Sequence, residues 1–209
     1  MSEQKPLLFT VFVEVQPDRT KEFNEWYNGV HVPEVVVCPG FLRSVRYEEV
    51  GAEGKFMAMY ELTGLEALES EGFGKARGWK EMQPVVKGSS SALWRHIYTA
   101  PPGKGAKGGD KATLLRFNRS SAQAEHDAEF NKWYNEEHLT ELLDCPGWLR
   151  ASRYEALRGD YQYLATYDLA GDSAMQSPEY FKARGFKSVE PYVTGASILA
   201  YREIFRWEG

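Results

Sequence analysis

The amino-acid sequence predicts an α+β fold built from two tandem copies of one small unit. The motif Phe-Asn-x-Trp-Tyr-Asn-x-x-His-x-x-Glu occurs twice, beginning at Phe23 and at Phe130. A Cys-Pro-Gly sequence follows each copy at the same distance, at Cys38 and Cys145. Each copy also shows the same order of strand and helix patterns. A long match without gaps is the mark of internal duplication, so the whole unit is predicted to be repeated.

The first copy has the pattern strand, helix, strand, strand, helix, strand. Strands are predicted from apolar and β-branched runs, and helices from apolar residues spaced three and four apart. Pro39-Gly40 has the composition of a type II turn, which separates the first helix from the next strand. The expected elements are strand 7–15, helix 17–36, strand 41–49, strand 56–62, helix 65–75 and strand 92–98, and residues 112–205 repeat this order.

This order of elements is typical of the ferredoxin-like βαββαβ unit, in which two helices cover one face of a four-stranded antiparallel sheet. The other face is left bare, and a second copy of the same unit is the economical way to cover it. The sequence therefore predicts an intrachain pseudo-dimeric α+β barrel. Its expected parts are residues 1–99, a Gly- and Pro-rich linker at 100–111, and residues 112–209.

Composition narrows the class of partner. Hydrophobic residues make up 43% and charged residues 26%, as in ordinary globular proteins. The net charge of -5 and the lack of a basic run argue against nucleic acid. No stretch has the roughly 20 apolar residues needed to cross a bilayer, and the first residues lack an apolar signal core. We expect a cytoplasmic protein with a small-molecule ligand and no membrane partner, with its oligomeric state open.

The two cysteines, Cys38 and Cys145, occupy equivalent places in the two copies. Duplication explains this placement better than a disulfide does, so each is predicted to be a buried structural thiol.

The repeated motif resembles that of the EthD-like branch of the dimeric α+β-barrel superfamily. The residues that carry the resemblance are Trp-Tyr-Asn-Glu-Glu-His-Leu at 133–139 and Cys-Pro-Gly-Trp-Leu at 145–149. The resemblance covers both halves of the chain. It implies a ligand crevice between helix and sheet. It does not choose among the superfamily's isomerases, cyclases, dehydratases, monooxygenases, haem enzymes and proteins without known activity.

His31 and His138 are the candidate catalytic residues, because helical spacing places each at the edge of the apolar face of the first helix in its copy. An imidazole with a pKa near 6.5 can give or take a proton at neutral pH. The nearby amides of Asn28 and Asn135 could orient a carbonyl or enolate oxygen. The alternative is that both histidines only brace the end of the helix.

Four further residues are candidates for ligand binding. Tyr27 and Tyr134 could stack on an aromatic ligand, although aromatic residues at helical spacing are more often core. Arg46 and Arg153 lie in the second strand of each copy and could bind a carboxylate through the guanidinium fork. Ion pairs with glutamates on the same strands are the alternative for these arginines.

Glu137 is the most unusual of the substrate-site candidates. Uniform α-helical spacing places it on the face occupied by Phe130 and Trp133, where an unpaired carboxylate is costly to bury. It must therefore reach a ligand, a partner or solvent. Gly29 and Pro33 are expected to loosen or shorten the equivalent helix of the first copy. These differences favour the second copy as the active one.

The motifs of dinucleotide, P-loop, nucleophile-elbow and zinc-ribbon proteins are missing from the sequence. His-x-x-Glu occurs in both copies, but two ligands are too few to predict a metal. We therefore expect a small enzyme without metal or cofactor, an isomerase, cyclase or dehydratase/lyase. It would transfer protons on an oxygenated, aromatic or cyclic small molecule. The alternatives are a non-catalytic binder or scaffold and, less favoured, a haem-binding protein.

Overall fold

The computed structural model describes residues 5–208 and divides them into two compact units. The first unit comprises residues 5–95 with Leu157–Gly159 and residues 203–208, and the second comprises His96–Ala156 and Asp160–Arg202. Residues 100–113 form neither helix nor strand. The boundaries expected from the sequence, 1–99, 100–111 and 112–209, stay a proposal about how the duplicated chain is divided.

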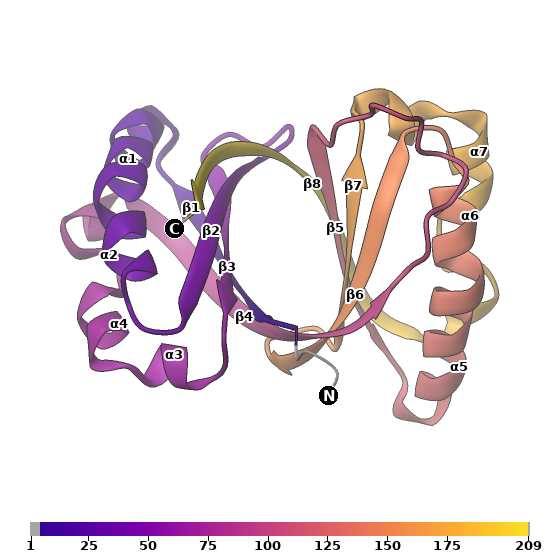
Figure 1. Cartoon of the computed structure of the whole chain (residues 1–209), viewed down its shortest axis with the longest axis horizontal. Helices are drawn as coiled ribbons and strands as arrows, with labels where there is room; N and C mark the ends of the chain where they lie inside the picture. The colour runs from indigo at the N-terminus through magenta and orange to yellow at the C-terminus, as the bar shows by residue number, and fades with distance from the viewer. Residues whose placement is uncertain (1–4, 209) are drawn as a thin grey trace. The chain divides into compact units, whose positions relative to one another are not determined.

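The first half of the chain follows the predicted order of elements (Figure 1). Short 3₁₀ turns at Pro17–Arg19 and Lys80–Val85 and a π-helical turn at Tyr27–His31 complete it. The strands and α-helices are β1 Leu7–Val15, α1 Thr20–Trp26, α2 Val32–Val36, β2 Phe41–Glu49, β3 Lys55–Leu62, α3 Glu66–Glu69, α4 Glu71–Ala76 and β4 Val86–Thr99.

The second half repeats the order. Its 3₁₀ turns are Ala124–His126, Asp172–Gln176 and Lys187–Tyr192, and its π-helical turn is Tyr134–His138. The strands and α-helices are β5 Leu114–Ala122, α5 Asp127–Trp133, α6 Leu139–Leu143, β6 Trp148–Arg158, β7 Tyr163–Leu169, α7 Pro178–Ala183 and β8 Val193–Glu208.

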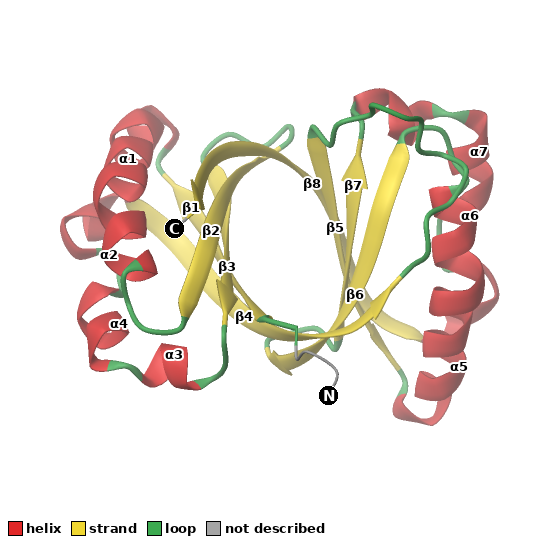
Figure 2. Cartoon of the chain, in the orientation of Figure 1, coloured by secondary structure: helices red, strands yellow, loops and turns green. Residues whose placement is uncertain are grey.

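Both halves have the strand order of a ferredoxin-like sheet, β4-β1-β3-β2 in the first and β8-β5-β7-β6 in the second. Neighbouring strands within each half are antiparallel, with Leu7 opposite Leu62 and Leu114 opposite Leu169. Helices cover one face of each sheet (Figure 2). The predicted fold class is thus confirmed: α+β, a tandem pair of ferredoxin-like units of the pseudo-dimeric barrel class.

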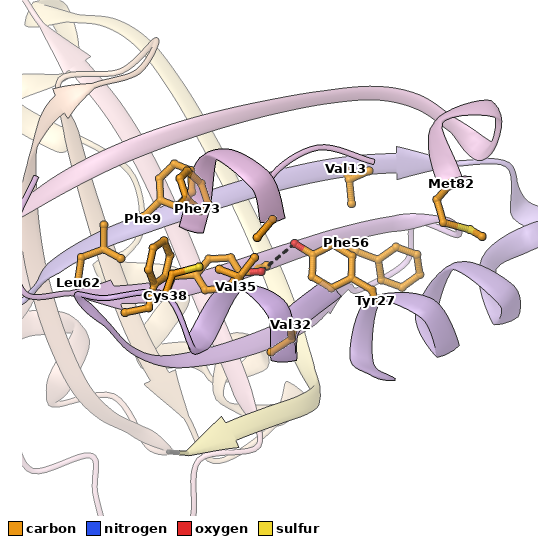
Figure 3. Close-up of a cluster of buried hydrophobic side chains, with 14 of the residues drawn as sticks. Phe9, Val13, Tyr27, Val32, Val35, Cys38, Phe56, Leu62, Phe73 and Met82 are labelled. Carbon is orange, nitrogen blue, oxygen red and sulfur yellow. Dashed lines mark hydrogen bonds between the residues drawn. The ribbon is translucent and has the colours of Figure 1, made fainter. Parts of the chain in front are cut away.

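The core of each unit lies between its helices and its sheet. In the first unit Phe23 is fully buried and contacts Tyr27 and Phe56, while Phe9 packs edge-on against Phe73 (Figure 3). Each such side chain contributes about 1.5–3 kcal/mol when fully removed from water. Both cysteines are free and buried, as predicted, and each thiol donates to the carbonyl four residues earlier.

The first helix of each copy differs from the uniform α-helix that the sequence predicts. A π-helical turn interrupts it at Tyr27–His31 and again at Tyr134–His138. Such a turn takes one extra residue, which rotates everything beyond it by one position around the helix. Glu137 therefore does not lie on the apolar face where uniform α-helical spacing places it; its side chain is exposed, which agrees with the alternative that it reaches solvent.

The same rotation brings the histidines inward. His31 and His138 are buried, with exposed fractions of 6% and 4%, while Val30, the counterpart of Glu137, is 42% exposed. The expected shortening of the first helix by Gly29 and Pro33 is wrong, because the helices of the two copies have the same pattern and the same lengths.

Candidate functional site

Each unit contains a cavity between its first helix and its sheet, with a volume of about 510 Å³ in the first unit and about 500 Å³ in the second. These volumes are in the range of small-molecule sites. Among the predicted residues, Tyr27 and His31 line the first cavity, and Tyr134 and His138 line the second. The helical motif and the predicted crevice therefore coincide.

His138 is held by aromatic rings. Its imidazole stacks on Trp133 with a centroid distance of 4.7 Å and an interplanar angle of 19°, and meets the ring of Tyr134 edge-on at 5.0 Å. Its Nδ1 is buried and has no hydrogen-bond partner among residues 5–208. Burial lowers the pKa of His138 to about 3, and the charges of Lys187 and Arg153 contribute in the same direction.

His31 repeats this arrangement in the first unit. Its ring stacks on Trp26 at 5.0 Å and 18° and lies edge-on to Tyr27 at 4.7 Å. Burial, helped by Lys80, lowers the pKa of His31 to about 4. Both histidines are therefore neutral at pH 7 and lack the protonated fraction that an imidazole with a pKa near 6.5 would have there.

A pair of tyrosines lies beside each histidine. The hydroxyls of Tyr27 and Tyr60 are 3.1 Å apart, and those of Tyr134 and Tyr167 are also 3.1 Å apart. Burial raises the pKa of each tyrosine, so all four keep their protons at neutral pH. The hydroxyl pairs fix the ring orientations of Tyr27 and Tyr134 against the sheet.

The predicted arginines and asparagines bond to each other instead of lining the cavities. Arg46, fully buried, donates to Asn28 at 2.6 Å, and its guanidinium lies 4.0 Å from the centroid of the Tyr27 ring. Arg153, also fully buried, donates to Asn135 at 2.8 Å. Burial lowers the pKa of Arg46 to about 10 and also lowers that of Arg153.

These arginines hold the helix to the sheet. Neither guanidinium forms an ion pair with a described residue, so the predicted pairing with glutamates of the same strand is not what holds them. The aromatic rings and amide oxygens around them stabilise the buried charge instead. The structure thus separates the predicted residues into two groups, with Tyr and His at the cavity and Asn and Arg in the layer behind it.

Sequence reasoning missed three cavity residues of the second unit: Arg116, Asn118 and Tyr180. Their counterparts in the first copy are Phe9, Val11 and Phe73, which line the first cavity. The signal was present in the repeat, because aligning the first strands of the two copies places an arginine opposite a phenylalanine.

No group of three or more His, Cys, Asp or Glu side chains among residues 5–208 is placed to hold a metal ion. Over the same residues, every helix is too short or too polar to cross a membrane.

No protein-family model matches the sequence, and no curated protein matches it.

Several solved structures are similar in fold. An anthrone oxidase-like protein is 14% identical, with a TM-score of 0.75 over 99% of this chain and 94% of that one. A proposed monooxygenase of Fusobacterium nucleatum is 12% identical, with a TM-score of 0.68 over 100% of this chain and 96% of that one. A chlorite dismutase variant of Candidatus Nitrospira defluvii is 10% identical, with a TM-score of 0.63 over 97% of this chain and 93% of that one. Identities this low show the fold alone, and the chain shares the fold of dimeric α+β-barrel proteins.

Proposed function

We propose that this chain is a small enzyme of the dimeric α+β-barrel type, related to the EthD-like branch. It binds an oxygenated aromatic or cyclic molecule in the cavity of the second unit and catalyses proton transfer at His138. The observation that carries the proposal is a buried, neutral imidazole at a cavity wall, with its Nδ1 unpartnered among the described residues. Burying a polar ring nitrogen without a hydrogen-bond partner destabilises the fold, and such groups at a cavity wall are found most often at functional sites.

The chemistry follows from the charge state of His138. Because Nδ1 is buried, Nε2 is the atom available to a bound molecule. A neutral imidazole can donate a hydrogen bond to a carbonyl oxygen or accept a proton from an acidic C–H or O–H. Its pKa of about 3 makes it a weak base in the empty cavity. Negative charge that develops on a bound substrate would raise that pKa and favour the transfer.

Isomerisation, cyclisation and β-elimination of water all begin with such a proton transfer. They need a ring or chain carbonyl whose neighbouring C–H is acidic, and a cavity that excludes water from the enolate. The aromatic walls of the cavity, including Trp148 and Phe186, suit a flat ring system.

A cofactor-independent oxidation is the second candidate, and the names of the anthrone oxidase-like and monooxygenase structures favour it. It shares the first step. A ring CH₂ between two aromatic rings, which conjugate it with a ketone, loses a proton, and the carbanion then reduces O₂; the CH₂ becomes C=O, and the remaining oxygen atom leaves as water.

Haem is the cofactor to test, because the fold neighbours include chlorite dismutases. Only Nε2 of His138 is available as a ligand, and a metal-binding histidine usually donates its other ring N–H to an acceptor. Nδ1 of His138 has no such acceptor among residues 5–208. The residues present do not fit an iron-ligating histidine. A Soret band near 400 nm in freshly purified protein would contradict this assignment.

Anthrone is a suitable probe, because its CH₂ group reports both candidate reactions. We expect the enzyme to accelerate exchange of the CH₂ protons with D₂O, followed by NMR without oxygen, and oxygen uptake is measured separately with an electrode. His138→Ala should abolish the acceleration, while His31→Ala should leave most of it.

His126→Ala is the matched control, because this histidine has no counterpart in the other copy and stacks on Tyr192 away from both cavities. A folded double variant His31→Ala, His138→Ala that keeps the full rate would refute catalysis by these residues. Tight binding of anthrone with no exchange and no oxygen uptake would identify the chain as a non-catalytic binder instead.

A further inference from the structure

The walls of the two cavities differ at three matched places although their frames are the same. In the first unit, Phe9 and Val11 of β1 and Phe73 of α4 present apolar side chains. In the second unit, Arg116, Asn118 and Tyr180 stand at the matching places and present a guanidinium, an amide and a phenol hydroxyl.

Arg116 has the contacts of an arginine that lacks a counter-ion. Its Nη1 donates to the sulfur of Met175 at 3.1 Å, and its Nη2 donates to the hydroxyl of Tyr180 at 3.2 Å. Its Nε is buried with no partner among the described residues. No carboxylate within residues 5–208 pairs with it.

The half-buried guanidinium of Arg116 has N–H donors that no described acceptor uses. Arginine offers five N–H donors, and one of the two that Arg116 uses goes to a weak sulfur acceptor. Charged groups removed from water without a partner are strongly disfavoured, so Arg116 is stabilised most by a negative charge in the cavity. Asn118 Oδ1 is likewise buried without a partner, which supports a built polar site.

The rest of the cavity fits the body of an aromatic molecule. Trp148 and Tyr180 stack on each other at 5.3 Å, and Phe186 lies across the cavity as part of its lining. Arg184 is exposed and lines the same cavity, and no described acidic side chain pairs with it. The combination is a cavity with aromatic walls and two positive charges in its lining, one of them the half-buried Arg116.

We propose that the cavity of the second unit selects an anionic aromatic molecule, a ring system that bears a carboxylate or phenolate, and that Arg116 binds the anionic group. This inference rests on the proposed function, since it names the substrate class of the same cavity. The first cavity has Phe9 in place of Arg116, and its arginines, Arg77 and Arg158, lie at other places in its lining, so the anion site at Arg116 has no direct counterpart there.

The test compares 2-naphthoate with its neutral analogue 2-naphthamide, using titration calorimetry on the whole chain. We expect wild-type protein to bind naphthoate more tightly than naphthamide. Arg116→Phe, which installs the residue of the first copy, should weaken naphthoate binding roughly 10- to 100-fold, the range for loss of a hydrogen bond to a charged group. Naphthamide affinity should change less than about threefold in the same variant.

Two further variants keep the test decisive. Arg116→Lys retains the charge without the fork and should restore part of the preference for naphthoate. Arg43→Ala removes an exposed arginine that pairs with Glu61 and should change neither affinity. Equal affinity of wild type for both probes, no binding of naphthoate, or unchanged naphthoate affinity in Arg116→Phe would each overturn the inference.

The outcome is separable from the proposed function. If His138→Ala binds naphthoate normally but loses anthrone exchange, the catalytic role and the anion site are both upheld. If wild type exchanges anthrone protons but Arg116→Phe binds naphthoate as well as wild type does, only the anion site fails. If naphthoate selectivity holds and no exchange occurs, only the catalytic proposal fails.

Discussion

The two cavities share one helix geometry but differ in the strand behind it. Both have a buried histidine stacked on a tryptophan, a tyrosine pair and a volume close to 500 Å³. Their walls differ because Phe9 corresponds to Arg116 and Val11 to Asn118. Two positions of one strand thus add a guanidinium and an amide to the second cavity without altering the frame, while the first cavity has its arginines, Arg77 and Arg158, elsewhere in its lining.

This difference indicates that the first helix and the first strand of each copy have separate roles. The helix, through its π-helical turn, fixes where the imidazole lies. The strand faces the cavity with alternate side chains, and each can be exchanged without moving its neighbours. The first helix of each copy therefore provides the chemistry that both units share, and the first strand determines which ligand each cavity binds.

The layer behind the cavities differs as well. In the first unit Arg46 donates to both Asn24 and Asn28, at 2.8 and 2.6 Å. In the second, Arg153 donates to Asn135 alone, because Asn131 instead donates to the hydroxyl of Tyr163. The counterpart of Tyr163 is Phe56, which offers no hydroxyl, so Asn24 stays with the arginine.

The largest expected effect comes from removing these buried arginines. Arg46→Ala should lower the free energy of unfolding by about 4 kcal/mol and Arg153→Ala by about 3 kcal/mol. Each substitution leaves a cavity, and Arg46→Ala leaves one more asparagine amide without its hydrogen-bond donor than Arg153→Ala does. Urea unfolding followed by circular dichroism measures the difference. Arg43→Ala, on the same strand but exposed, is the control and should cost less than about 1 kcal/mol. A larger loss in Arg153→Ala than in Arg46→Ala would contradict the comparison.

The next effect is a pH dependence of stability that both histidines create. The unfolded chain takes up protons on His31 and His138 near pH 6.5, while the folded chain resists protonation until about pH 4 and pH 3. Stability is therefore complete above about pH 6.5 and falls as the pH is lowered. At pH 5.5 the loss should be about 1 kcal/mol for each histidine.

Unfolding free energies at pH 7.5 and 5.5 measure this loss. His31→Phe and His138→Phe keep an aromatic ring against the tryptophan and should each remove about half of the pH effect. The same slope in wild type and in the double variant would show that other groups cause it.

The smallest effect is expected at the residues that the π-helical turn carries outward. Glu137→Val and Val30→Glu should each change the free energy of unfolding by no more than about 0.5 kcal/mol, since both side chains are exposed. Leu139→Glu is the control, because Leu139 is fully buried and a carboxylate there should unfold the second unit. Thermal midpoints report both changes, and a strong gain in stability from Glu137→Val would place that residue on the buried face after all.

The strands could be predicted closely from the sequence, and the helix–cavity geometry could not. β1 and β2 begin and end where their apolar runs and the Pro-Gly turn indicate. β4 begins at Val86, earlier than expected, because residues 88–91 are a glycine and three serines that carry no strand signal. The ferredoxin-like order followed from the strand and helix patterns within one copy.

The site could be predicted only in part. The motif located His138 and Tyr134 at the cavity, but the extra residue of the π-helical turn has no compositional mark, so Glu137 was placed on the wrong face. The bond between Arg153 and Asn135 joins a strand to a helix, and helical spacing alone cannot reveal such a pairing. Arg116 lies outside the motif, and comparing the first strands of the two copies would have revealed it.

The π-helical turn has a consequence for how this protein can change. Both copies contain it at the same place, so it was already present in the single ancestral unit before duplication. A point substitution cannot remove an extra residue from a helix; only a deletion can. Point substitutions could therefore alter the cavity walls of the two copies freely. The inward position of the histidine was inherited by both copies, because it depends on the number of residues in the helix.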